Sequence, residues 1–226
     1  MRKIILIALT SLPLFAGFFP STTHTSISSI NGNDVSLRSS LPATGMSGIV
    51  VHDYGNALEA VTHYIVQTSK GKAKLIGQDI LHHEALPTIK TSVAKGDKVI
   101  GGYLYNNVLL LAPDAKTYTK ITSSHRKKWI HPDLFALFLT QEGDSQPTKA
   151  NLAAFAKKYQ IGLIYIVRKN AAILLDPISG QIVNKKSMKN LPSKGVYPFF
   201  MRFEEIDTGW FSSKKTGNYY KIMESI

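Results

Sequence analysis

The chain has 226 residues, 44% of them hydrophobic, which is enough for one large domain or two small, closely packed ones with a real core. It carries 27 Lys or Arg against 15 Asp or Glu, a formal net charge of +12 that favours anionic partners. It contains no cysteine, which excludes disulfides, thiolate metal sites, cysteine nucleophiles and a lipidated N-terminal cysteine.

The first 19 residues have the features of a secretory signal peptide. Arg2 and Lys3 give a positive start, and residues 4–19 carry no charge. As a helix this apolar run would span roughly 24 Å, less than the hydrocarbon thickness of about 30 Å. We therefore expect cleavage after Ala16, export, and no stable transmembrane anchor after processing. Leu14 is large for its position before the cut, so an uncleaved anchor is the alternative.

The N-terminal half of the remaining chain predicts β structure. Residues 20–47 are rich in Ser, Thr, Asn and Gly, with apolar residues too sparse for a continuous buried face, and we expect a flexible lead-in. Residues 48–115 contain short β-branched runs, and the run 95–113 predicts a hairpin that turns at Asn106 and Asn107. In that run Gly101 and Gly102 indicate a bulge or a close backbone approach. These runs predict a small barrel or a meander.

The C-terminal half, residues 116–210, changes to helical periodicity before returning to strands. Residues 132–139 and 148–159 predict helices, the second capped by Thr148, and residues 161–183 predict a three-stranded meander. The fold class is therefore α+β, with residues 211–226 as a C-terminal tail. We expect six apolar side chains to be buried: Leu110, Leu111, Ile164, Ile166, Leu174 and Phe199.

Signatures of catalysis and of cofactor binding are missing. The sequence has no nucleophile elbow, P-loop or dinucleotide fingerprint, and its one carboxylate cluster, Glu204, Glu205 and Asp207, fits a solvated turn better than an acid–base pair. We therefore expect a protein that is not an enzyme and has no cofactor.

The histidines do not form a convincing metal site. His82 and His83 would point to opposite faces of an extended segment. His52 and His63 can meet across a hairpin, but no nearby carboxylate pair completes a ligand set. We expect no metal. The basic residues also lack the interleaved aromatics of a nucleic-acid stacking platform, so we expect no nucleic acid partner.

The basic residues occur mainly as short clusters. They are ordinary solubilising charges, or they are contacts for a partner that reads an ammonium group. The clusters are 126–128, 157–158, 185–186 with Lys189, and 214–215.

An ordered set of motifs between residues 48 and 207 resembles a known family. It includes the run 95–113, the strand at residues 161–167 and the segment 198–207 that begins Pro-Phe-Phe. Together they are similar to the N-terminal domain family of the plasminogen-binding protein PgbA, an envelope protein family of spiral gastric and enteric bacteria. The resemblance implies a Gram-negative protein of the periplasm or outer cell surface, and some members capture host plasminogen through lysines.

The resemblance also guides the choice of binding residues. Better-known members continue into a Lys/Glu-rich tail that ends in lysine, and the kringle modules of plasminogen recognise an ammonium with a carboxylate at a fixed distance. In this sequence an internal Lys and an acid on one helical face can replace that terminal lysine. The expected contacts are Lys214, Lys215, Lys221 and Glu224. The alternative function is a periplasmic structural or assembly component that docks onto other envelope proteins.

Overall fold

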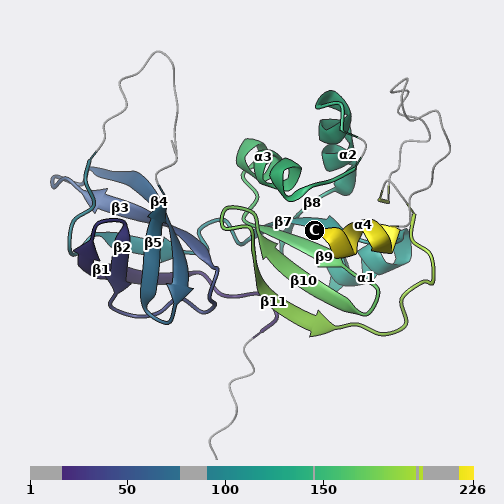
Figure 1. Ribbon diagram of the computed structural model, residues 1–226, viewed down its shortest axis with the longest axis horizontal. Coiled ribbons are helices and arrows are strands. Elements are labelled where there is room, and N and C mark those ends of the chain that lie inside the picture. Colours follow the sequence, from purple (N-terminus) through teal and green to yellow (C-terminus); the bar gives the residue numbers. More distant parts are fainter. Residues whose placement is uncertain (1–16, 77–90, 145, 197–198, 201–218) are drawn as a thin grey trace, which may run out of the picture.

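The computed structural model describes residues 17–76, 91–144, 146–196, 199–200 and 219–226. Its strands form a closed six-stranded barrel, on the left of Figure 1, and a five-stranded sheet with helices, on the right. Barrel and sheet together make the fold α+β, with a small barrel in the N-terminal half, as the sequence predicts.

The barrel is built entirely from antiparallel pairs in the order β1-β2-β5-β4-β3-β6, and pairing of β1 with β6 closes it. Where β3 pairs with β6, Gly48 lies opposite Gly101, and a Cβ on Gly48 would stand 2.6 Å from the carbonyl oxygen of Ile100. This confirms the predicted close approach at Gly101. The strands are β1 (Thr23–Asn31), β2 (Asp34–Leu37), β3 (Ser47–Asp53), β4 (Glu59–Ser69), β5 (Lys72–Ile76) and β6 (Lys98–Gly101).

The second sheet has the order β11-β10-β9-β7-β8. β9, β10 and β11 form the predicted antiparallel meander, and β7 extends it by pairing in parallel with both β9 and β8. The strands are β7 (Asn107–Leu111), β8 (Lys128–Ile130), β9 (Leu163–Val167), β10 (Ala171–Asp176) and β11 (Gln181–Ser187). The helices are α1 (Ala115–Ser124), α2 (Pro132–Gln141), α3 (Lys149–Tyr159) and α4 (Tyr219–Ser225).

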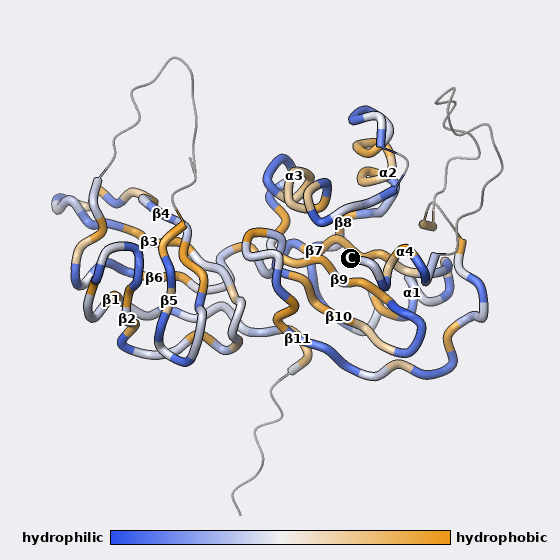
Figure 2. Tube along the Cα trace, viewed as in Figure 1, coloured by the Kyte–Doolittle hydropathy of each residue, from blue (hydrophilic) through white to orange (hydrophobic). Residues whose placement is uncertain are grey.

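Both faces of the second sheet are covered, because alternate side chains of a strand point to opposite faces. Leu111 and Ile164 pack with the apolar sides of α2, α3 and α4. Leu110 and Tyr165 belong to the other face, which Ile121 of α1 and the N-terminal residues Phe18 and Phe19 cover. In Figure 2 the central strands of this sheet are accordingly the most continuous hydrophobic part of the trace.

The predicted helices form where their end signals lie. The Thr148 hydroxyl accepts the backbone N–H of Asn151 at 3.1 Å, and the Asn151 side chain accepts the N–H of Thr148 at 3.0 Å, so the two form a capping box at the start of α3. The last residue of the helix is followed by Gln160 in the left-handed region, with a φ of 54°. α2 begins with Pro132 in its first turn, which confirms the helix predicted at residues 132–139.

All six side chains predicted to be buried have a relative exposure of 0%. A fully buried aliphatic side chain contributes about 1.5 to 3 kcal/mol relative to an exposed one. Five of them lie on strands of the second sheet, on both of its faces, and Phe199 packs with the side that α2, α3 and α4 cover, so the two layers around that sheet are the main core of the C-terminal half.

Residues 20–47 contradict the prediction of a flexible lead-in, because they contain β1 and β2 of the barrel. Interior-facing residues alternate with exterior ones along a barrel strand, so a short strand can contain few apolar residues. In β1 only Ile27 is fully buried, which explains why its polar sequence does not look like a strand.

The predicted hairpin over residues 95–113 is also wrong. β6 belongs to the barrel and β7 to the second sheet, so residues 102–106 connect two sheets instead of reversing the chain within one.

The start of the folded body lies before residue 19. Phe18 and Phe19 pack on the second sheet, so a signal peptide that ended at residue 19 would include part of the core. Within the residues described here, no helix is long and apolar enough to cross a membrane.

Candidate functional site

The predicted contacts Lys221 and Glu224 lie on α4, whose other side is fixed to the sheet. Tyr219 is fully buried, and its hydroxyl lies 2.8 Å from the carbonyl oxygen of Leu111 and 3.0 Å from that of Val167. Burial raises the pKa of this tyrosine well above its usual value, so the hydroxyl keeps its proton. The helix is therefore held by its apolar side, while Lys221 and Glu224, three residues apart, are exposed on the other.

The turn between β9 and β10 brings a second lysine to Glu224. The Arg168 Nε donates to the carbonyl oxygen of Met223 at 3.0 Å, and its Nη1 lies 3.8 Å from Glu224 Oε2. The backbone N–H of Lys169 donates to Glu224 Oε1 at 3.3 Å. The Lys169 side chain is exposed, as is that of Lys221, so the two segments that meet at the half-exposed Glu224 carboxylate each carry one exposed lysine. We call Lys169, Lys221 and Glu224 the α4 surface.

The other two predicted contacts, Lys214 and Lys215, lie outside the described residues. Sequence reasoning also missed Lys169, which is 55 residues away from Glu224 in the chain. No local pattern connects the two, since the β9–β10 turn and α4 meet only through the folded sheet.

A second cationic region surrounds Phe18 and Phe19, which we call the N-terminal aromatic pair. Asn184 Nδ2 donates to the carbonyl oxygen of Phe18 at 2.7 Å, and Lys186 Nζ lies 4.2 Å from the centre of the Phe18 ring. Lys127 Nζ lies 4.8 Å from the centre of the Phe19 ring. Cations over aromatic rings are attracted by the ring quadrupole, so the two lysines help to hold the pair in place.

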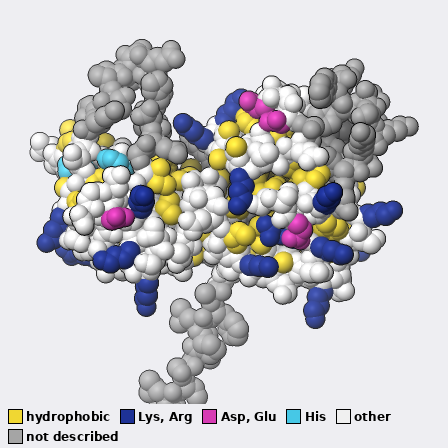
Figure 3. All heavy atoms as spheres, viewed as in Figure 1, with side chains coloured by type: hydrophobic (Ala, Val, Ile, Leu, Met, Phe, Trp, Pro, Cys, Tyr) yellow, Lys and Arg dark blue, Asp and Glu magenta, His cyan; other side chains and the backbone are white. Residues whose placement is uncertain are grey.

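Charges of one sign dominate this region. Burial lowers the pKa of Lys127 and of Lys186, while burial and then the charges of Lys186 and Lys127 lower the pKa of His125. Among the residues that the structure describes, no carboxylate lies within 4.0 Å of either lysine. Neither lysine therefore has a directly paired acid among these residues. Figure 3 likewise shows many more basic than acidic side chains on the visible face.

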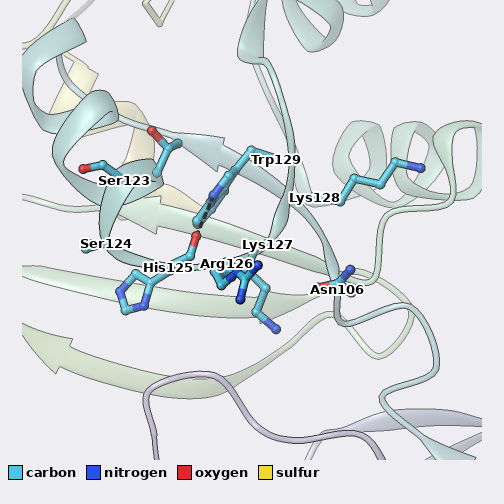
Figure 4. A pocket seen from close by; sticks show the side chains of 9 residues that line it. Asn106, Ser123, Ser124, His125, Arg126, Lys127, Lys128 and Trp129 are labelled. Atoms are coloured by element: carbon cyan, nitrogen blue, oxygen red, sulfur yellow. Dashed lines mark hydrogen bonds between the residues drawn. The ribbon is translucent and has the colours of Figure 1, made fainter.

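An open depression of about 600 Å³ lies beside this region, at the turn from α1 to β8. Figure 4 shows the side chains of this turn, which point in several directions. The indole N–H of Trp129 donates to the carbonyl oxygen of His125 at 3.2 Å. No acidic residue lines the depression, so it suits an anion better than a cation. Its lining residues are Asn106, Thr122, Ser123, Ser124, His125, Arg126, Lys127, Lys128 and Trp129.

A narrower groove of about 410 Å³ separates the barrel from α3. Its lining includes Tyr64, Tyr103 and Tyr105, and it contains no carboxylate or histidine. Burial raises the pKa of Tyr64, and burial together with the charge of Asp176 raises that of Tyr105. A raised pKa keeps both hydroxyls protonated, so neither is prepared to act as a base.

The histidines of the barrel do not assemble a metal site. His52 Nδ1 lies 2.8 Å from Asp97 Oδ1, whereas His63 lies opposite Val50 and its Nδ1 has no hydrogen-bond partner. Within the described part of the chain, no group of three or more His, Cys, Asp or Glu side chains is placed to hold an ion. His82 and His83 lie outside the described residues, as does the acidic cluster at residues 204–207.

Comparison with known proteins points to one family. A family model described as plasminogen-binding protein pgbA N-terminal matches residues 22–226. Two curated relatives, both called plasminogen-binding protein PgbA, come from Helicobacter pylori strains J99 and 26695, and each is 29% identical over 191 residues. The alignment covers 80% of this chain but 42% of each relative, so the chain spans less than half of their length. No solved structure matches the chain.

Proposed function

Since the chain belongs to the PgbA N-terminal family, we propose that it is an exported, non-enzymatic envelope protein that binds plasminogen through exposed lysines of the α4 surface. The observation that supports the proposal is that the exposed Lys169 and Lys221 belong to the two segments that meet at the Glu224 carboxylate. A kringle lysine site takes an ammonium with a carboxylate near it. The α4 surface offers this combination without a terminal lysine.

The local structure lowers the entropy cost of binding at the α4 surface. A free surface lysine loses about 2 kcal/mol of side-chain entropy when a partner immobilises it. At the α4 surface the backbone is already fixed, because Arg168 and Lys169 bond to the end of α4 through Met223 and Glu224. Less order must therefore be imposed on binding than at a lysine on a free tail.

The charge pattern predicts how the binding responds to solution conditions. Interactions between exposed charges are screened beyond about 8 to 10 Å at physiological ionic strength, so added salt should weaken capture of plasminogen. A soluble lysine analogue carries the same pair of charges and should compete for the same kringle site.

The proposal is tested by immobilising plasminogen on a biosensor and titrating the purified protein with and without a lysine analogue. We expect the analogue to abolish binding and salt to weaken it. Binding that persists at saturating analogue, or no binding at all, would contradict the proposal.

Location is tested separately by protease shaving of intact cells. A surface binder should be digested, while an intracellular control protein in the same cells stays intact. Survival of the protein on intact cells, with digestion after the outer membrane is opened, would instead favour the alternative of a periplasmic assembly component.

A further inference from the structure

Two segments at the second sheet carry positive charge and no acidic residue. Residues 115–131 and 181–196 together hold nine Lys or Arg and no Asp or Glu. The first segment contains α1 and β8, and the second contains β11. We call these two segments, with the N-terminal aromatic pair, the basic face.

The two basic segments meet at the N-terminal aromatic pair. The ring of Phe19 lies 5.0 Å from that of His125 and 6.2 Å from that of Trp129, both in the first segment. Phe18 contacts Asn184 and Lys186 in the second. Both segments therefore hold the place where the described chain begins, at the exposed residue Gly17.

The chain before Gly17 has a strong preference for a membrane. Residues 4–16 carry no charge and are mostly apolar, and residues of an extended chain span at most about 3.6 Å each. Since Gly17 is the one residue between this run and the aromatic pair, a membrane that holds the run lies next to the basic face while the run stays attached.

We propose that the basic face docks on a membrane surface by binding the anionic phosphate headgroups of phospholipids. The fixed cations match a layer of phosphates in charge, and no acidic side chain within the two segments opposes them. Basic residues beside an anionic leaflet each add to the attraction, and that attraction decays within a Debye length. The half-buried ring of Trp129 lies among the cations, and tryptophan favours the headgroup level of a bilayer.

The aromatic pair and its cations lie away from the α4 surface, although Pro192 at the end of the second segment accepts a hydrogen bond from the Tyr220 hydroxyl of α4 at 2.7 Å. α4 packs with the apolar side chains of Leu111 and Ile164, whereas the aromatic pair packs with those of Leu110 and Tyr165, on the opposite face of the same sheet. A protein docked by its basic face would leave α4 on the side away from the lipid. The two activities can therefore be tested independently.

The test is flotation of the full chain with two kinds of vesicle, pure phosphatidylcholine and phosphatidylcholine containing phosphatidylglycerol. The apolar N-terminal run contributes equally to both, so the ratio of the two partition coefficients reports the headgroup charge. The test variant is Lys120→Glu with Arg126→Glu, because both side chains are exposed on the basic face. The control is Lys149→Glu with Lys157→Glu on α3, which makes the same change of net charge on the other side of the sheet.

We expect wild type and control to prefer the anionic vesicles, and the Lys120/Arg126 variant to lose about tenfold or more of that preference. Equal partition of wild type into both vesicles, or the same loss in the control, would overturn the proposal. Inorganic phosphate is then added against chloride at matched ionic strength. Equal release by both salts supports docking on a lipid surface, and selective release by phosphate would show a site for the free ion instead.

Discussion

The Tyr105 hydroxyl donates a 2.6 Å hydrogen bond to Oδ2 of Asp176, a carboxylate that is completely buried. The same oxygen accepts the backbone N–H of Ser47 at 2.8 Å, and Oδ1 accepts those of Ile178 and Ser179 at 2.9 and 3.0 Å. Ser47 begins a barrel strand and Asp176 ends a strand of the second sheet, so one carboxylate joins the two parts of the fold.

We predict that Tyr105→Phe lowers the free energy of unfolding by about 1.5 to 3 kcal/mol, because a buried carboxylate loses one of its donors. The measurement is urea unfolding followed by circular dichroism. Tyr103→Phe is the matched control, since its side chain is 54% exposed and the change should stay within about 0.5 kcal/mol. Equal stability of the two variants would show that the Asp176 contact contributes nothing to the fold.

Truncation of the sheet core should be far more costly. Ile164 is fully buried on the central strand β9, and Ile164→Ala is expected to cost about 2 to 5 kcal/mol. Ile182→Ala on the edge strand β11, where the side chain is 44% exposed, should cost much less. An unfolding midpoint of Ile164→Ala that matches wild type would refute the placement of β9.

The N-terminal aromatic pair should contribute to stability as part of the folded body. Phe19→Ala removes ring contacts with His125 and Trp129 and the cation contact of Lys127, and we expect a loss of about 1 to 2 kcal/mol. Leu58→Ala, at a side chain that is 65% exposed, serves as the control in the same urea titration. No loss in Phe19→Ala would place residues 18–19 outside the cooperative unit.

Stability should fall at alkaline pH. Burial raises the folded-state pKa of Tyr105, Tyr165 and Tyr219 above the usual tyrosine value of about 10. Below pH 10 the folded and the unfolded protein both keep these protons. Above pH 10 only the unfolded chain releases them, so each tyrosine lowers the free energy of unfolding by up to about 1.4 kcal/mol per pH unit. Lys127 and Lys186 have the opposite effect on stability, because burial lowers their pKa in the folded state. Between that lowered pKa and 10.5 the unfolded chain holds more protons than the folded one, so stability rises with pH there.

The check is the unfolding midpoint in urea between neutral pH and pH 11, with tyrosinate absorbance recorded in parallel. The fold is expected to lose stability before the buried tyrosines ionise. Complete ionisation near pH 10 with an unchanged circular dichroism spectrum would contradict the burial of these hydroxyls.

Local sequence signals predicted the elements whose periodicity and end signals lie within a few residues. α3 has its capping box at Thr148, and the β9–β11 meander has turns that are short and visible in the sequence. The strand pairing of β7 could not be predicted in this way, because its partners β8 and β9 follow it by many residues and run parallel to it. A closed barrel likewise makes strands of polar sequences such as β1, since their neighbours supply the hydrogen bonds.

The residues of the candidate site likewise include some that the sequence predicted and some that it did not. Lys221 and Glu224 were predicted from their spacing on one helix, and the structure places both on the exposed side of α4. Lys169 and the basic face were not predicted, because residues distant in sequence meet there only after the second sheet has formed.

The measurement that tests the proposed function most directly is the affinity for plasminogen of the variant Lys169→Ala with Lys221→Ala. Its control is Lys149→Ala with Lys157→Ala, which removes two exposed lysines of α3 and the same charge. Loss of lysine contacts at a charge-complementary interface should weaken binding of the first variant by about tenfold or more and leave the control close to wild type. Unchanged affinity of the Lys169/Lys221 variant, or an equal loss in the control, would contradict the assignment of plasminogen binding to the α4 surface.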